Sequence, residues 1–173
     1  MFTWHAHAGA VTALAFGPGG RFLVSAGTDE CVRVWDPLAG REEWCASLRV
    51  DDFLRLPGDP VGPPRHLVTS ADRVAVASPA LGLVLLDLAT GRELGSVPLS
   101  DVRALKAPPD GASFLTLASA WSGREPAVRQ YDFDGGALAT PILLPTRSGP
   151  TALAVSSDGS RVAAGTTLFA WPP

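Results

Sequence analysis

The feature that most constrains the fold of this 173-residue chain is an internal repeat. Residues 11–48 contain four short runs of β-branched, aromatic and other apolar residues, separated by turn sequences such as the Gly-Pro-Gly-Gly of residues 17–20. Runs of this length with turn chemistry between them predict consecutive antiparallel strands. Residues 13–16 are apolar at successive positions, so we expect both faces of this sheet to be covered. The 18 glycines and 16 prolines suit short strands and turns better than helices.

A second unit is recognisable downstream. Residues 83–93 match residues 32–42 almost position for position, with Leu86 in place of Trp35. We place the first strand of this unit at His66–Thr69 rather than at residues 53–56. The stretch before it is rich in proline, which cannot donate to a strand ladder and therefore indicates an enlarged surface connection.

A third and a fourth unit follow. Residues 102–132 repeat three of the runs, with Tyr131 at the position of Trp35, and residues 151–171 open a last unit that has no fourth run. The equivalent residues Asp36, Asp87 and Asp132 are 51 and 45 residues apart. This period is close to that of four-stranded propeller blades. The predicted units are residues 7–48, 65–98, 101–144 and 150–171, preceded by a closing strand at residues 1–4.

The first unit resembles the WD-repeat β-propeller family. It has His7 before the first strand, Ser25 on the second, Asp29 in the next turn and Trp35 with Asp36 at the end of the third. The resemblance implies an all-β propeller of about four WD-repeat blades, each a four-stranded antiparallel sheet, either partial or completed by oligomerisation. It also implies a hydrogen-bonded tetrad that runs from Trp35 through Ser25 and His7 to Asp29.

The donor and acceptor inventory agrees with such a tetrad. Tryptophan only donates, serine donates and accepts, neutral histidine does one of each, and aspartate accepts, so the four groups can satisfy one another when buried. The other units lack parts of the pattern. The second has neither the tryptophan nor the turn aspartate, the third has no histidine before Val102, and the last has Trp171 without a following aspartate. We therefore expect these units to depend on apolar packing.

The number of units leaves the closure of the ring open. The family resemblance implies seven or eight blades for a closed ring, whereas this chain supplies about four. Residues 2–4 precede the first unit, and the last unit lacks an outer strand, so a closing strand is available. Three arrangements are compatible with this: an eight-bladed ring shared by two chains in a homodimer, an open partial propeller, and a four-bladed ring within one chain.

The charge balance argues against two classes of partner. Fourteen basic and 17 acidic residues give a formal net charge of −3, and neither nucleic acid nor an anionic membrane attracts such a surface. The uncharged stretch of residues 74–86 is too short to cross a bilayer. We therefore predict a cytoplasmic protein without nucleic-acid or membrane partners. Lys106 is the only lysine, which suggests a high-GC, bacterial genome.

Several residues that could carry chemistry have plainer explanations. His5 and His7 are spaced like a metal-binding pair, but zinc needs three or four ligands, and we assign His7 to the tetrad and His5 to an exposed loop. Cys31 and Cys45 are expected to be reduced, buried thiols. The glycine-rich residues 17–20 are not followed by a helix and are expected to form a hairpin turn instead of a phosphate cradle. No metal site or cofactor is predicted.

The best candidate for binding is the loop of residues 119–126. It contains Trp121 and Arg124, two residue types enriched at interaction hot spots, and it is predicted to share a rim with His5 and Glu30. With no catalytic constellation in the sequence, we expect a noncatalytic scaffold that presents rim loops to a protein or peptide. The alternative is a truncated or degenerate propeller fragment with a purely structural role.

Overall fold

The computed structural model describes residues 3, 5–48, 62–99, 101–118, 126–144, 150–165 and 167–171. These residues form four antiparallel sheets and one short 3-10 turn, η1 (Pro18–Gly20). No helix in these ranges is long and apolar enough to cross a membrane. The predicted all-β fold is confirmed.

Strands that are consecutive in the chain are neighbours in each sheet. The first sheet contains β1 (Val11–Phe16), β2 (Leu23–Gly27), β3 (Cys31–Asp36) and β4 (Arg41–Ser47). The second contains β5 (His66–Thr69), β6 (Arg73–Ser78), β7 (Gly82–Asp87) and β8 (Glu93–Val97). The third contains β9 (Val102–Lys106), β10 (Ser113–Ala118), β11 (Ala127–Asp132) and β12 (Ile142–Leu143). The fourth contains β13 (Leu153–Val155), β14 (Arg161–Ala164) and β15 (Thr167–Ala170).

The structure therefore has the first strand of the second sheet at His66–Thr69, the position preferred from the sequence. The alternative position, residues 53–56, lies outside the described residues, as do residues 1, 2 and 4 of the closing strand. That strand stays a prediction.

The repeated aspartates have a local role in the turns that follow the third strands. Asp36 Oδ1 accepts hydrogen bonds from the backbone N–H groups of Leu38 and Ala39, both at 2.9 Å. Asp87 Oδ1 accepts equivalent bonds from Ala89 and Thr90. Because these side chains pair turn amides that would otherwise lack partners, the same hairpin can be built in both units.

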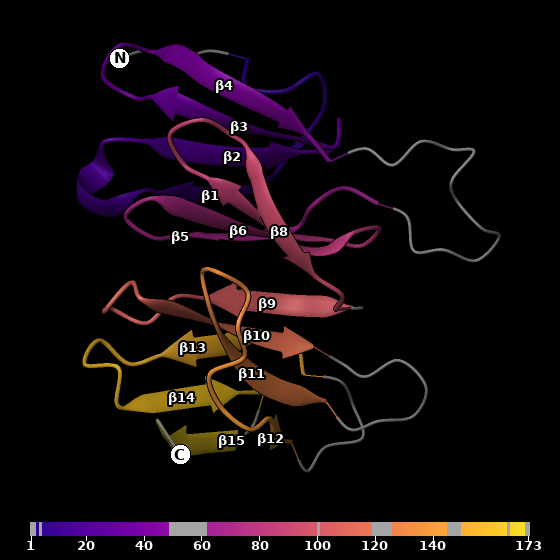
Figure 1. Ribbon diagram of the computed structural model, residues 1–173, viewed down its shortest axis with the longest axis vertical. Helices are drawn as coiled ribbons and strands as arrows, with labels where there is room; N and C mark the ends of the chain where they lie inside the picture. Colours follow the sequence, from indigo (N-terminus) through magenta and orange to yellow (C-terminus); the bar gives the residue numbers. More distant parts are fainter. Residues whose placement is uncertain are drawn as a thin grey trace, which may run out of the picture.

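The four sheets pack in series along the long axis of the molecule, from the first sheet at the top of Figure 1 to the fourth at the bottom. Their innermost strands follow one another, with β1 against β5, β5 against β9 and β9 against β13. Three hydrophobic clusters join consecutive sheets. Fully buried members include Val34 and Leu86 in the first cluster, Leu85 and Phe114 in the second, and Leu117 and Val162 in the third.

Hydrogen bonds reinforce the junction between the first two sheets. Thr69 Oγ1 donates to the Phe16 carbonyl at 2.9 Å, and Trp44 Nε1 donates to the Leu88 carbonyl at 2.9 Å. Trp44 also packs against the first cluster. This junction therefore combines apolar burial with paired polar groups.

The expectation that both faces of the first sheet are covered is wrong for this structure. Ala13 and Ala15 pack against the second sheet, but Leu14 and Phe16, which point the other way, are each 61% exposed. The reason is that the first sheet stands at the end of the series. In the described residues no hydrophobic cluster joins it to the fourth sheet.

The serial packing predicts that residues in the clusters between sheets contribute most to the free energy of unfolding. Replacing Leu117 by Ala removes a fully buried side chain from the third cluster and should cost about 2–5 kcal/mol of unfolding free energy. The matched control is Leu38→Ala in an exposed turn, which should change stability by less than about 0.5 kcal/mol. Denaturant titration measures both, and equal effects would contradict the assignment of the core.

Candidate functional site

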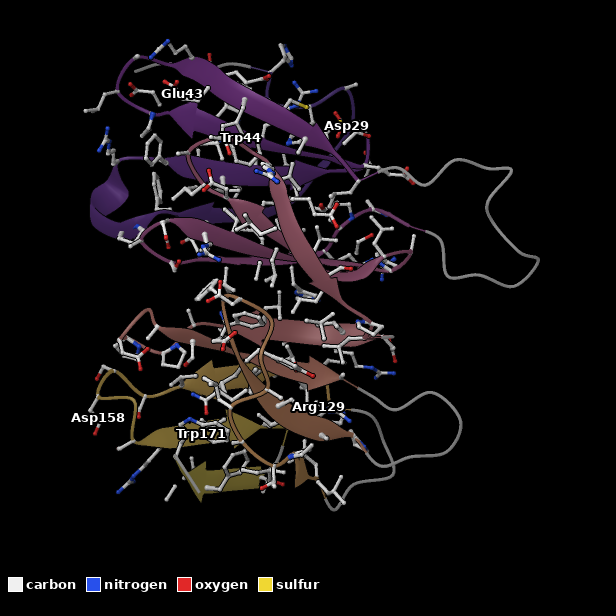
Figure 2. The ribbon with its side chains drawn as sticks, in the orientation of Figure 1. Asp29, Glu43, Trp44, Arg129, Asp158 and Trp171 are labelled. Carbon is white, nitrogen blue, oxygen red and sulfur yellow. The ribbon has the colours of Figure 1, made fainter. Side chains whose placement is uncertain are left out.

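The candidate site lies at one end of the first sheet. It is formed by residues 5–10, which precede β1, and by the turn of residues 27–30 between β2 and β3. Figure 2 shows Asp29 at this end and Asp158, from the turn between β13 and β14, on the opposite side of the molecule. We call the end that carries Asp29 the tetrad rim.

The structure brings His7, Ser25, Asp29 and Trp35 into one chain of hydrogen bonds. Trp35 Nε1 lies 2.9 Å from Ser25 Oγ, and Ser25 Oγ lies 2.7 Å from His7 Nε2. His7 Nδ1 lies 2.8 Å from Asp29 Oδ1. The side chain of His7 is fully buried, and that of Asp29 is 14% exposed.

One set of proton positions satisfies every member. Trp35 donates its indole N–H to Ser25, Ser25 donates its hydroxyl proton to Nε2 of a neutral His7, and His7 donates from Nδ1 to the Asp29 carboxylate. Because each buried donor has an acceptor, the chain avoids the cost of about 1–3 kcal/mol for an unsatisfied buried group. The arrangement ties the segment before β1 to three other parts of the first sheet.

Asp29 anchors the rim through further contacts. Its Oδ2 accepts from the backbone N–H of Ala8 at 3.2 Å, and its Oδ1 accepts from that of Cys31 at 3.3 Å. Burial by itself would raise the pKa of Asp29, but the hydrogen bonds from His7 and from these two amides outweigh burial and lower the pKa. The carboxylate is therefore held in its ionised form.

Gly27 is a part of this site that the sequence analysis missed. A Cβ atom at Gly27 would lie 2.4 Å from His7 Nδ1 and 2.8 Å from Asp29 Oδ1, so no side chain fits beside that pair. The sequence signal was present as a glycine two residues before Asp29. It could not be separated from an ordinary turn glycine, because Gly27 does not have a left-handed backbone.

The predicted binding residues divide into two groups. His5 is exposed on the tetrad rim, and Glu30 is half-buried in the turn of residues 27–30. Glu30 has φ +59°, in the left-handed region that favours glycine. Trp121 and Arg124 lie outside the described residues, and their role stays a prediction.

The expectation of two buried thiols is wrong. Cys31 is half-buried and Cys45 is exposed, because both lie on β3 and β4 facing away from the second sheet. Partial burial of its sulfur and the neighbouring Cys31 thiol raise the pKa of Cys45 to about 11. Cys45 is therefore almost entirely in the unreactive thiol form at neutral pH.

Two features of the described residues bear on metal and small-molecule sites. They contain no group of three or more His, Cys, Asp or Glu side chains that could hold a metal ion. Two hollows on the side opposite the tetrad rim have volumes of about 210 and 220 Å³. Both are smaller than the roughly 300–1,000 Å³ of typical ligand pockets. An ion pair between Arg73 and Asp134 borders the first of them.

The sequence comparisons concern the part of the chain that builds this site. Residues 1–36 match the family model described as WD domain, G-beta repeat. Residues 1–36 are therefore similar to a WD repeat. The predicted resemblance to the WD-repeat family is thereby confirmed, and the matched residues include all four members of the tetrad.

Curated relatives match over a similar length. The ribosome biogenesis protein erb1 of Aspergillus clavatus is 46% identical over 46 residues, which is 27% of this chain and 6% of that protein. The ribosome biogenesis protein ERB1 of Coccidioides immitis is 43% identical over 50 residues, 29% of this chain and 6% of its own length. The chain therefore spans a small part of these relatives. They are fungal, so they give the predicted bacterial source no support.

Solved structures match this chain over nearly all of its length. The computationally designed Ika4 protein aligns with a TM-score of 0.71 and 19% identity, covering 98% of this chain and 94% of that one. A chain of the mitotic checkpoint complex aligns with a TM-score of 0.69 and 16% identity, covering 92% of this chain and 47% of that one. At these identities the likeness concerns the fold, and the propeller architecture is confirmed.

Two Trp→Phe variants can separate the contribution of the tetrad's hydrogen bonds to stability from the contribution of apolar packing. Trp35→Phe should cost about 1–3 kcal/mol of unfolding free energy, because it removes the hydrogen bond that the indole donates to Ser25 Oγ and leaves a gap. The control is Trp171→Phe, at the equivalent position of the fourth sheet, where the described residues give the indole no hydrogen-bond acceptor. Its cost should be smaller by about the value of one buried hydrogen bond, about 1 kcal/mol. Equal losses in denaturant titrations would contradict the tetrad's contribution.

The lowered pKa of Asp29 makes a prediction about pH. Since the folded-state pKa lies below the unfolded value of about 4, ionised Asp29 stabilises the fold fully above that value. This contribution is lost as the pH falls through the folded-state pKa. The stability difference between the natural chain and Asp29→Asn should therefore shrink when denaturant midpoints are measured from pH 6 to pH 2. A difference that stayed constant across this range would refute the assigned direction.

Proposed function

We propose that this chain is a noncatalytic interaction scaffold that presents the tetrad rim to a protein or peptide partner. The observation that carries the proposal is the backbone of Glu30, which has φ +59° in a turn anchored by the tetrad. A non-glycine residue in this conformation costs roughly 1–2 kcal/mol. Such strain at a rigid surface position is typical of residues whose side chains are used in recognition.

The turn around Glu30 is firmly held. Glu30 N–H donates to the Gly27 carbonyl at 3.1 Å, and the Glu30 carbonyl accepts from the Leu48 N–H at 2.8 Å. Asp29 beside it is bound to His7 and to two backbone amides. A loop that is already ordered loses little conformational freedom when a partner binds, which supports affinity.

A second strained position supports the same rim. Asp101 has φ +53° and precedes β9, the innermost strand of the third sheet. Because β9 and β1 occupy equivalent places in their sheets, Asp101 and residues 5–10 lie at the same end of the sheets. Asp101 Oδ2 accepts hydrogen bonds from Arg103 at 3.0 and 3.2 Å. Glu30 and Asp101 are the non-glycine residues with positive φ in the described part of the chain, and both are acidic.

The similarity of residues 1–36 to a WD repeat and the small size of two hollows point in the same direction. Members of the WD-repeat family commonly bind partners through rim loops, and the two hollows near Arg73 and Trp171 are small for a substrate. The fungal relatives are named for ribosome biogenesis, and this chain spans 6% of their length. For this chain we therefore propose the interaction role alone.

The proposal predicts that charge reversal at Glu30 removes partner binding. Glu30→Lys should lower the recovery of specific partners at least about tenfold in quantitative affinity capture from the source cells, while the melting temperature stays near that of the natural chain. The matched control is Glu93→Lys, at an exposed residue at the start of β8 on the opposite side. Trp121→Ala should weaken the same partners by roughly 2 kcal/mol. Partners captured equally by all variants would reject the tetrad rim as the binding surface.

A further inference from the structure

The position of Trp35 in the series of sheets is different from that of its equivalents. Leu86 and Tyr131 occupy the corresponding place on the third strands of their sheets, and Trp171 directly follows the third strand of the fourth sheet. Each is buried in the cluster that joins its sheet to the preceding one. Trp35 lies on the same face of the first sheet, where none of the three clusters joins a preceding sheet.

The face of the first sheet around Trp35 carries exposed apolar side chains. Leu14 pairs across the ladder with Ser25, and Phe16 pairs with Leu23, so these residues share the face of the tetrad. Leu14 and Phe16 are each 61% exposed. In the other sheets the corresponding face packs in a hydrophobic cluster, so the exposed Leu14 and Phe16 give this face the character of an unfilled interface.

The fourth sheet has a second uncovered face at the other end of the series. Leu153, Val162 and Phe169 pack toward the third sheet. The residues that alternate with these along each strand point away from the third sheet. Ala154 pairs with Ala163, and Ala163 pairs with Leu168, so these three residues share the outward face. Ala154 is exposed and Leu168 is 65% exposed.

The two uncovered faces continue the pattern of the internal interfaces. Where the first sheet meets the second, Ala13 and Ala15 on the innermost strand pack in a cluster with Leu67 and Leu86 of the next sheet. Where the third meets the fourth, Ala104 on the innermost strand packs in a cluster with Leu153 and Trp171. An innermost strand with a small residue thus faces larger residues of the following sheet.

The same pairing is available between the ends of the chain. Ala154 is the small residue on innermost strand β13, and Leu14 and Phe16 with Trp35 are the larger residues on the first sheet. One chain therefore holds both halves of a fourth interface, at opposite ends of its long axis (Figure 1). They do not meet within the described structure of the single chain.

We infer that a second copy of this chain covers both faces. The first sheet of each copy packs on the fourth sheet of the other, which makes two identical interfaces related by a two-fold axis. Eight sheets then form one closed ring, within the usual range of four to eight blades, whereas three copies would exceed that range. The pairing removes Leu14, Phe16 and Leu168 from water.

The test is the mass of the natural 173-residue chain in solution, measured by light scattering over a hundredfold range of concentration. We expect twice the 18.0 kDa of one chain, with dissociation on dilution. Phe16→Glu and Leu168→Glu should each raise the dissociation constant about 100-fold or more, because each would place a charge in one half of the interface. Both sites are exposed in the single chain, so its fold should persist.

Two further measurements make the test specific. Leu38→Glu, in an exposed turn outside both faces, should leave the dimer unchanged. Mixing the Phe16→Glu and Leu168→Glu chains should restore part of the association, because the mixed pair keeps one unmodified interface. A monomer at all concentrations, an open series of larger species, or a dimer that is weakened by Phe16→Glu but not by Leu168→Glu would overturn the inference.

Discussion

Burial of both faces of each sheet is the constraint on which the rest of this structure depends. A short antiparallel sheet with apolar side chains on both sides cannot be stable alone in water, and stacking supplies the missing cover. Here the second and third sheets are covered on both sides, by clusters that contain fully buried residues such as Leu86 and Phe114. The first and fourth sheets are covered on one side. This imbalance explains the exposed Leu14, Phe16 and Leu168 in a protein whose other faces are closely packed.

On the first sheet, hydrogen-bonded polar side chains partly replace the apolar cover that its outward face lacks. Its outward face carries the chain from Trp35 through Ser25 and His7 to Asp29, which buries polar groups without leaving any of these four unsatisfied. The second and third sheets have Leu86 and Tyr131 at the place of Trp35 and depend on apolar contacts there. The same polar chain fixes the turn that contains Glu30. Stability of the first sheet and order of the proposed binding rim therefore have one physical origin.

Much of this architecture could be predicted because it is local. The turn aspartates Asp36 and Asp87, the strand at His66–Thr69 and the spacing of the tetrad follow from hairpin chemistry and from a family resemblance. The features that could not be predicted depend on which sheets meet. The exposure of Cys45 and Phe16 reflects the open end of the series, and the close approach of Gly27 to His7 depends on the path of residues 5–10. Alternation along a strand shows that a face is apolar, but it does not show what covers that face.

The central claim is that the two end faces of one chain meet those of another. It is tested most directly by cross-linking a chain with Leu14→Cys and Ala154→Cys on the innermost end strands, in a Cys31→Ser and Cys45→Ser background. A short bis-maleimide would be applied to a mixture of isotopically light and heavy copies. We predict peptides that join position 14 of one isotope to position 154 of the other. Cross-links confined to copies of one isotope would show that the ring closes within a single chain, and no cross-link between these positions would show that the faces stay apart.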